Sequence, residues 1–242
     1  MAIETTNPTQ PLFYRKPEPL DVARHKTLGV RADSDFSFCQ TANVVMLTAM
    51  EFALASRSYP IVFTANADAL PVTILGLRNG ENLFVRDGRW TKHTYIPAYV
   101  RRYPFAFLEP EDKKSLILCV DIDAEAVVEG AETKFFDEDG RPSKFTQNAL
   151  DFCRSFQIQY NVTRQLVAVL KKHDLLVTRQ ADIKLPSGTK TAVHDFLVVD
   201  EQKLNGITDE VFLEFRKNNI LPFLYFHLLS LANFRELADR AG

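Results

Sequence analysis

The chain has 242 residues, of which 46% are hydrophobic and 25% are charged. This composition is typical of a folded globular protein and excludes a disordered, collagen-like or coiled-coil chain. Because 29 basic residues almost balance 31 acidic ones, no overall field favours nucleic acid or an anionic membrane as a partner.

Three cysteines, Cys39, Cys119 and Cys153, are odd in number and far apart, which predicts reduced core residues rather than a disulfide framework. The first residues hold neither a basic region nor an apolar run, unlike a secretion signal. This favours a cytoplasmic location, with signal-independent export to the cell surface as the alternative. The longest apolar stretch, residues 220–229, is about half the length of a membrane span, which argues against a transporter permease.

Residues 1–40 are rich in proline and polar side chains, and they predict an irregular N-terminal arm without chemistry of its own. Residues 41–242 are expected to form a single domain. Within it, Thr48 and Glu51 have the spacing of a capping box at the start of a short helix. Glu51 is therefore assigned a capping role in preference to a catalytic one. Residues 59–64 follow as a buried strand.

Two tight-turn signals, Asn79-Gly80 and Asp87-Gly88, separate β-rich runs between Pro71 and Ile96. Each signal favours a two-residue type I′ turn, so three antiparallel strands in a meander are expected. The loop lengths set the register, with four facing pairs: Arg78 and Glu81, Leu75 and Phe84, Val85 and Trp90, and Arg86 and Arg89.

The second half of the chain predicts both helices and strands. Residues 116–120 form a further strand, and apolar residues from Phe145 to Leu170 follow the period of an amphipathic helix, either continuous or broken near Asn161. Residues 175–185 and 191–199 predict a hairpin. One helix begins after Thr208, and another runs from Pro222 to about Asp239. The expected fold class is α+β, with an antiparallel or mixed sheet, meander plus hairpin, packed on the long helix and the C-terminal helices.

Catalytic signatures are missing from the sequence. It contains no nucleotide-binding, hydrolase or zinc-protease motif, and its five histidines lack metal-ligand spacing. Asp121 and Asp123 lie two apart at a strand end, as paired acid and base groups require, but a helix-capping role for Asp123 is preferred. No residue is designated as a nucleophile. We therefore favour a non-catalytic protein and expect neither a cofactor nor a metal.

The segment from Arg86 to Pro104 is strongly basic, because five basic residues stand against Asp87 alone, a net charge of +4. Guanidinium groups beside aromatic rings suit an anionic, ring-bearing or glycan-like ligand. Residues 105–140 have a net charge of −8, so mutual neutralisation inside the fold is the favoured alternative. The candidate ligand- or partner-binding residues are Arg86, Arg89, Trp90, His93, Tyr95, Tyr99, Arg101, Arg102 and Tyr103.

Several longer blocks of the chain resemble one family. They are Tyr59-Pro60-Ile61-Val62-Phe63, Gly76-Leu77-Arg78, Asn82-Leu83-Phe84-Val85, Gly88-Arg89-Trp90, the run from Tyr95 to Phe105, Phe136-Asp137 with Asp139-Gly140, and Val199-Asp200-Glu201. Together they are similar to the SapC family from about residue 44 to the end of the chain. The resemblance implies a bacterial protein named for an association with a paracrystalline surface layer (S-layer), and it supplies no catalytic residues.

Two functions follow as hypotheses. The first is an accessory or binding protein of the surface-layer type, which contacts another protein or an envelope glycan. The second is a small-molecule enzyme with Tyr95, Arg101, Arg102 and His93 around an anionic substrate. In addition, the last predicted helix carries a second apolar stripe, formed by Phe223, Phe226, Phe234 and Leu237. Such a stripe predicts either burial inside the domain or a face for self-association.

Overall fold

The computed structural model describes residues 12–33, 35–108 and 116–242. The first eleven residues of the predicted arm, and the signal expectation that rests on them, lie outside the described residues. In chain order the elements are β1 (Pro17–Pro19), α1 (Val22–His25), β2 (Leu28–Val30), η1 (Ser37–Cys39), β3 (Val44–Met46), η2 (Ala49–Glu51), α2 (Phe52–Ala55), β4 (Ile61–Thr64), β5 (Pro71–Ile74), β6 (Val85–Arg86), β7 (Arg89–Trp90), α3 (Ala98–Arg101), β8 (Phe105–Leu108), β9 (Ile117–Asp121), β10 (Val127–Glu129), β11 (Thr133–Lys134), α4 (Lys144–Lys172), β12 (Leu176–Lys184), β13 (Lys190–Val199), α5 (Glu201–Asn205), α6 (Asp209–Lys217), α7 (Leu221–Ser230) and α8 (Asn233–Arg240).

The largest sheet has the strand order β12-β13-β4-β5-β3, and its pairings are antiparallel. β4 and β5 are buried along their whole length, which agrees with their largely apolar sequences. β12 and β13 form the predicted hairpin, with a bulge between Arg179 and Ala181. The α+β class and the antiparallel sheet predicted from the sequence are confirmed.

The predicted meander is correct only in its second hairpin. There the structure confirms two facing pairs, Val85 with Trp90 and Arg86 with Arg89. Asp87 and Gly88 both have positive φ angles, 51° and 70°, as a type I′ turn requires. The first strand of the predicted meander is wrong, because β5, where that strand begins, pairs with β3 on one side and β4 on the other. The predicted pairs Leu75 with Phe84 and Arg78 with Glu81 therefore belong to no ladder. Leu75 follows β5, and its carbonyl accepts the backbone N–H of Leu83 at 2.8 Å.

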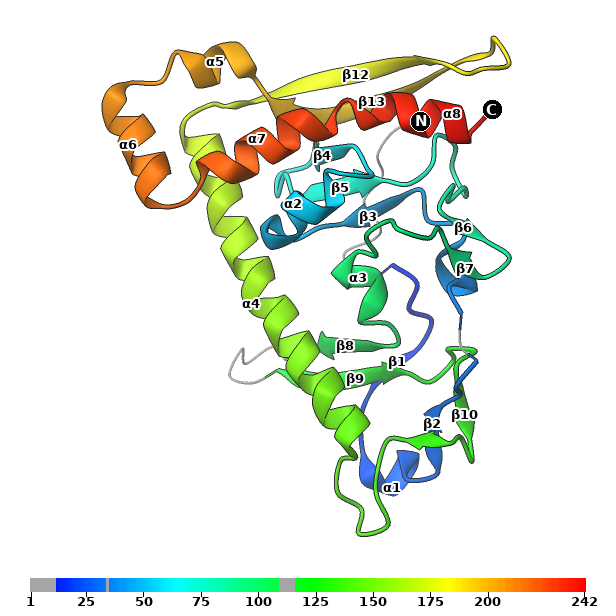
Figure 1. The fold of residues 1–242 in the computed structure, drawn as a ribbon. Helices are drawn as coiled ribbons and strands as arrows, with labels where there is room; N and C mark the ends of the chain where they lie inside the picture. Colours follow the sequence, from blue (N-terminus) through cyan, green and yellow to red (C-terminus); the bar gives the residue numbers. More distant parts are fainter. Residues whose placement is uncertain (1–11, 34, 109–115) are drawn as a thin grey trace.

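Helix α4 connects the two hydrophobic clusters of the protein. It is continuous, without a break near Asn161, and Ser143 caps its first turn by accepting the backbone N–H of Thr146 at 3.2 Å. Phe156 and Leu170 belong to the larger cluster, beside the five-stranded sheet, whereas Cys153 belongs to the smaller one. Figure 1 shows α4 running from the large sheet down to β8 and β9. The helix therefore lies across the boundary between the clusters.

The smaller cluster is enclosed by short strands, two of which come from the N-terminal part of the chain. β1 pairs with β9, which also pairs with β8. β2 pairs with both β10 and β11. Phe105 and Phe135 are buried between these strands and α4, with ring centroids 5.5 Å apart. The N-terminal segment thus provides sheet edges on this side of the protein.

The C-terminal region has four helices where the sequence predicted two. The predicted helix from Pro222 to Asp239 is interrupted between α7 and α8. At the interruption, the side-chain amide of Asn233 donates to the backbone carbonyls of Ser56 and Tyr59, at 2.7 and 3.0 Å. These contacts tie α8 to the segment after α2. Among the described residues, none of the helices combines the length and the apolarity required to cross a bilayer.

Candidate functional site

The structure separates the nine predicted site residues into three groups. Trp90 and Tyr99 are core residues, and the Trp90 indole N–H donates to the Tyr59 hydroxyl at 3.1 Å. Three others, Arg86, Arg89 and His93, are exposed on the β6–β7 hairpin and the turn after it; Figure 1 shows this hairpin on the side of the molecule away from α4. The last four, Tyr95, Arg101, Arg102 and Tyr103, lie around α3 and come together near α4.

Glu51 holds α3 in place. Its buried carboxylate completes the predicted capping box, with Oε2 accepting the backbone N–H of Thr48 at 2.7 Å and the Thr48 hydroxyl at 2.9 Å. The other oxygen, Oε1, accepts the backbone N–H of Ala98 at 2.6 Å and the Tyr95 hydroxyl at 3.1 Å. The Tyr95 oxygen in turn accepts Arg101 Nη2 at 2.9 Å. Glu51 therefore caps η2 and also orients Tyr95 and, through it, Arg101.

Tyr95 remains protonated in this arrangement. Burial and the neighbouring Glu51 carboxylate raise the pKa of its hydroxyl to about 12. A phenol with such a pKa does not serve as a base near neutral pH. Tyr95 is consequently a hydrogen-bonding link between Glu51 and Arg101.

Arg101 and Arg102 lie at the edge of a hollow beside α4, which we call the α4 slot. The Arg101 guanidinium lies over the Phe152 ring at 5.1 Å and donates from Nε to the Ile96 carbonyl at 3.0 Å. The Arg102 guanidinium lies over the rings of Tyr99 and Phe156, at 4.1 and 4.6 Å. The slot has a volume of about 340 Å³ and is lined by Val30, Asp35, Phe38, Arg101, Arg102, Tyr103, Pro104, Phe105, Ala126, Phe145, Asn148, Ala149 and Phe152.

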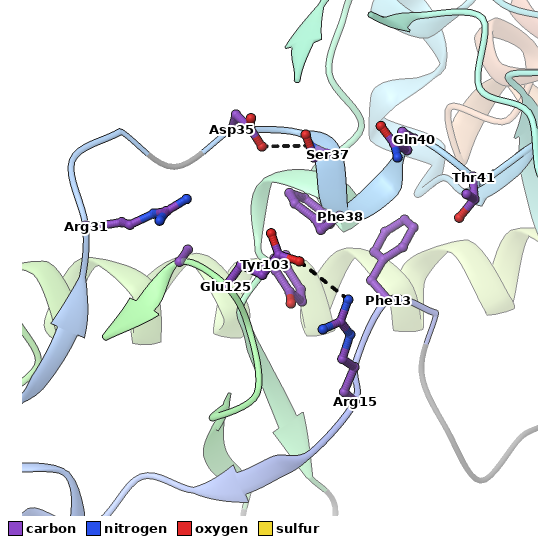
Figure 2. Close-up of a pocket in the computed structure, with 11 residues that line it drawn as sticks. Phe13, Arg15, Arg31, Asp35, Ser37, Phe38, Gln40, Thr41, Tyr103 and Glu125 are labelled. Atoms are coloured by element: carbon purple, nitrogen blue, oxygen red, sulfur yellow. Dashed lines mark hydrogen bonds and ion pairs between the residues drawn. The ribbon is translucent and has the colours of Figure 1, made fainter. Parts of the chain in front are cut away.

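A second hollow of about 390 Å³, the Tyr103 hollow, shares Asp35, Phe38, Tyr103 and Ala126 with the slot. The rings of Phe38 and Tyr103 are stacked with centroids 4.2 Å apart. Figure 2 shows Asp35 beside Ser37 at the upper edge of this hollow and an ion pair between Arg15 and Glu125 at the lower edge. The Tyr103 hollow thus carries charges of both signs around an aromatic centre.

Asp121 holds the Tyr103 hydroxyl through a hydrogen bond. Its buried carboxylate accepts the backbone N–H groups of Arg15 and Lys16, at 2.9 and 2.7 Å, and the Tyr103 hydroxyl at 3.2 Å. Burial and the Asp121 charge raise the pKa of Tyr103 well above its ordinary value. Asp123, in contrast, is exposed in a turn, and no helix follows it. The two carboxylates therefore do not face one substrate, and the capping role preferred for Asp123 is wrong.

Mutual neutralisation of the basic and acidic segments has little support among the described residues. The ion pairs found there do not join residues 86–104 to residues 105–140. The hydrogen bond from Tyr103 to Asp121 does join them. Arg101 and Arg102 face aromatic rings instead of carboxylates.

Sequence reasoning missed most of the lining of the two hollows, of which only Arg101, Arg102 and Tyr103 were predicted. Phe13, Arg15, Arg31, Asp35 and Phe38 come from the N-terminal segment, where no site residue was expected. Phe145, Ala149 and Phe152 come from α4 and lie at i, i+4 and i+7 on one face of the helix. That helical spacing was visible in the sequence, but it indicates core packing as readily as a binding wall.

None of the three cysteines has the setting of an activated nucleophile. Burial raises the pKa of Cys39 to about 12 and of Cys153 to about 11, and it also raises the pKa of Cys119. Such thiols remain protonated and unreactive at neutral pH. Among the described residues, no three or more His, Cys, Asp or Glu side chains are grouped as metal ligands. The arrangement is therefore suited to binding an anionic group beside aromatic rings.

The comparisons with known proteins address the family and leave the activity open. No curated protein and no solved structure gives a significant match to the chain. One family model, SapC, matches residues 20–237. The match begins in the N-terminal segment that supplies β2 and Asp35, and it includes the whole α4 slot and all of the Tyr103 hollow except Phe13 and Arg15. It covers nearly the whole chain, so the protein belongs to the SapC family.

Proposed function

We propose that this protein is a non-catalytic accessory or binding protein of bacterial envelope or surface-layer biology, which holds an anionic partner at the α4 slot. The observation that carries the proposal is the pair Arg101 and Arg102, whose guanidinium groups lie on aromatic rings with no carboxylate within 4 Å among the described residues. Charged groups without an opposite charge nearby favour an anionic ligand. In this proposal the protein acts from the cytoplasm, with signal-independent export as the alternative.

The partner we favour is an anionic envelope glycan or an acidic segment of a surface-layer protein. Aromatic rings beside the arginines provide flat apolar contacts, as ring-bearing ligands require. Arg86, Arg89 and His93 are exposed outside the slot, and Arg89 and His93 line a neighbouring hollow that shares Asp35 with it. They therefore extend the contact only for a large partner. We propose them as secondary contacts.

The alternative, a small-molecule enzyme, requires His93 and Tyr95 to act together with the arginines. His93 lines a further hollow with Arg89 and Trp90, which borders the α4 slot at Asp35. Tyr95 lines a fourth hollow with Glu51 and Arg101, where its hydroxyl is already hydrogen-bonded on both sides. Because these groups do not converge on one hollow, binding without catalysis is the better supported function.

The test is affinity capture from the native bacterium, with bound proteins, glycans and small molecules identified by mass spectrometry. Arg102 is unsuitable for substitution because its guanidinium packs on Tyr99 and Phe156, so removing it would also disturb the core. Arg101→Gln should lose the partner while its melting temperature stays near that of the wild type. Arg164→Gln, an exposed change elsewhere on α4, is the matched control. Equal capture by both variants would refute the proposal.

A further inference from the structure

We infer that the α4 slot binds a small amphipathic acid, with one carboxylate or phosphate group at Arg101 and Arg102 and an apolar body between Phe105, Phe145 and Phe152. This inference rests on the proposed binding function and specifies the ligand that the slot itself accepts. Its basis is the combination of size, apolar walls and two arginines in the lining.

The walls of the slot define the apolar part of the ligand. Phe145, Ala149 and Phe152 face it from α4 and are only partly buried. The Phe105 and Phe145 rings, whose centroids are 5.7 Å apart, also line it. Polar lining comes from few side chains, namely Asp35, Arg101, Arg102 and Asn148. A lining of apolar walls with a small number of polar groups is typical of small-molecule sites.

The arginines define the polar part. Among the described residues, Arg101 donates two of its five N–H groups, to Ile96 and Tyr95. Arg102 has a buried Nε without a hydrogen-bond partner among the described residues. Asp35 is the one acidic side chain in the described lining, and its carboxylate accepts the Ser37 backbone N–H at 2.9 Å. The lining therefore keeps a net positive charge, and a guanidinium pairs best with a carboxylate or a phosphate.

The volume sets the size of the ligand. The slot of about 340 Å³ corresponds to roughly eleven water molecules at about 30 Å³ each, and hence to an acid of roughly a dozen non-hydrogen atoms. Such a ligand places one ring or short alkyl body against the phenylalanines while its anion reaches the arginines. A neutral ligand of the same shape leaves the arginine donors unpaired, which is unfavourable in a partly buried site.

The experiment compares three ring compounds of matched size by calorimetric titration: 3-phenylpropionate, phenyl phosphate and neutral 3-phenylpropanol. We expect saturable binding of one or both acids and at least about tenfold weaker binding of the alcohol. The two acids distinguish a carboxylate from a phosphate. Arg101→Gln should weaken acid binding about tenfold or more, whereas Arg164→Gln should leave it unchanged.

A second variant tests the apolar body. Ala149→Leu narrows the slot and should weaken both acids while Arg101 and its charge remain in place. Circular dichroism and thermal unfolding establish that each variant is folded; if Ala149→Leu does not fold, the ring protons of bound 3-phenylpropionate should instead show nuclear Overhauser effects to Phe145 or Phe152. Binding without such effects would overturn the placement.

The outcomes also separate this inference from the proposed function. If neither acid binds, or if the alcohol binds equally well, the inference is wrong. Capture of the native partner that still depends on Arg101 would then leave the proposed function in place. If the acids do not bind and partner capture does not depend on Arg101, both the inference and the proposed function are wrong.

Discussion

The imidazole of His227 bridges the backbones of β13 and β4 by hydrogen-bonding to Val199 and Ile61. The ladder joining these strands pairs Phe196 with Thr64 and Leu197 with Phe63, and its continuation would place Val199 opposite Ile61. Instead, His227 Nε2 accepts the Val199 backbone N–H at 3.0 Å and Nδ1 donates to the Ile61 carbonyl at 2.8 Å. Helix α7 thereby satisfies the strand groups that the ladder leaves unpaired.

This position predicts a loss of stability in mild acid. Burial lowers the pKa of His227 to about 4, whereas an unfolded histidine titrates near 6.5. Below that pH the unfolded chain takes up a proton that the folded chain does not. The free energy of unfolding should therefore decrease between about pH 6.5 and about pH 4, by roughly 3 kcal/mol from this residue. Urea unfolding at a series of pH values measures the decrease.

The control is His227→Gln, whose amide keeps one donor and one acceptor without titrating. We expect the variant to be less stable at pH 7 and to lose less stability than the wild type on acidification. His25 also has a lowered pKa, but its contribution is common to both proteins and cancels in the comparison. Parallel pH profiles of the two proteins would contradict the assignment.

Gly88 is required by both the turn and the site. Its φ angle is 70°, and a Cβ atom built there would lie 2.1 Å from Oδ2 of Asp35. Gly88→Ala should therefore reduce the free energy of unfolding by about 2 to 3 kcal/mol, from backbone strain and displacement of Asp35. Gly80→Ala is the matched control, since Gly80 has φ 76° with nothing within 4 Å, and it should cost only about 1 kcal/mol. Equal decreases in the free energy of unfolding for the two variants would show that the Asp35 side chain moves aside without an energetic cost.

Glu51 should matter for stability because its four acceptor contacts are buried. Glu51→Gln replaces one accepting oxygen with a donor that faces N–H or O–H groups, so we expect a loss of about 2 to 3 kcal/mol. The exposed Glu132→Gln should change stability by less than about 0.5 kcal/mol. Chemical denaturation checks both. A Glu51→Gln protein as stable as the wild type would show that the capping network contributes little.

The sequence predicts well where local chemistry decides the structure. The Thr48–Glu51 capping box, the Asp87-Gly88 turn and the period of α4 each depend on residues close together in the chain, and all three are present. The position of β5 was missed because β3 and β4, both earlier in the chain, occupy its two edges, and a two-residue turn does not outweigh these pairings.

The site was predictable only in part for the same reason. Arg101, Arg102 and Tyr103 form a basic aromatic run that is visible in the sequence. Their neighbours Phe38 and Phe152 come from η1 and α4, far away along the chain. Tertiary contacts bring these parts together, and no local spacing encodes them. Arg86 and Arg89 share the composition of the run, but the hairpin carries them to another surface.

The apolar stripe of the last helices leads to the final prediction. Phe234 stacks on Phe196 with centroids 5.9 Å apart, and Phe223 contacts Phe52 at 6.2 Å, so this stripe packs within the monomer. Phe234→Asp should therefore destabilise the protein by about 3 kcal/mol or more. Self-association through α7 would instead use its exposed face. Leu229 and Tyr225 lie on that face and are 67% and 57% exposed.

Leu229→Asp distinguishes the packing of α7 within the monomer from a contact with a second copy of the chain. Because Leu229 contributes little to the core, this change should alter the free energy of unfolding by less than about 0.5 kcal/mol. If α7 also pairs with a second copy of the chain, a charge at its exposed face should abolish the dimer seen in sedimentation velocity, since a buried unpaired carboxylate is costly. A wild-type protein that sediments as a monomer at all concentrations, or a dimer unaffected by Leu229→Asp, would rule out this face. Phe234→Asp would then report on folding alone.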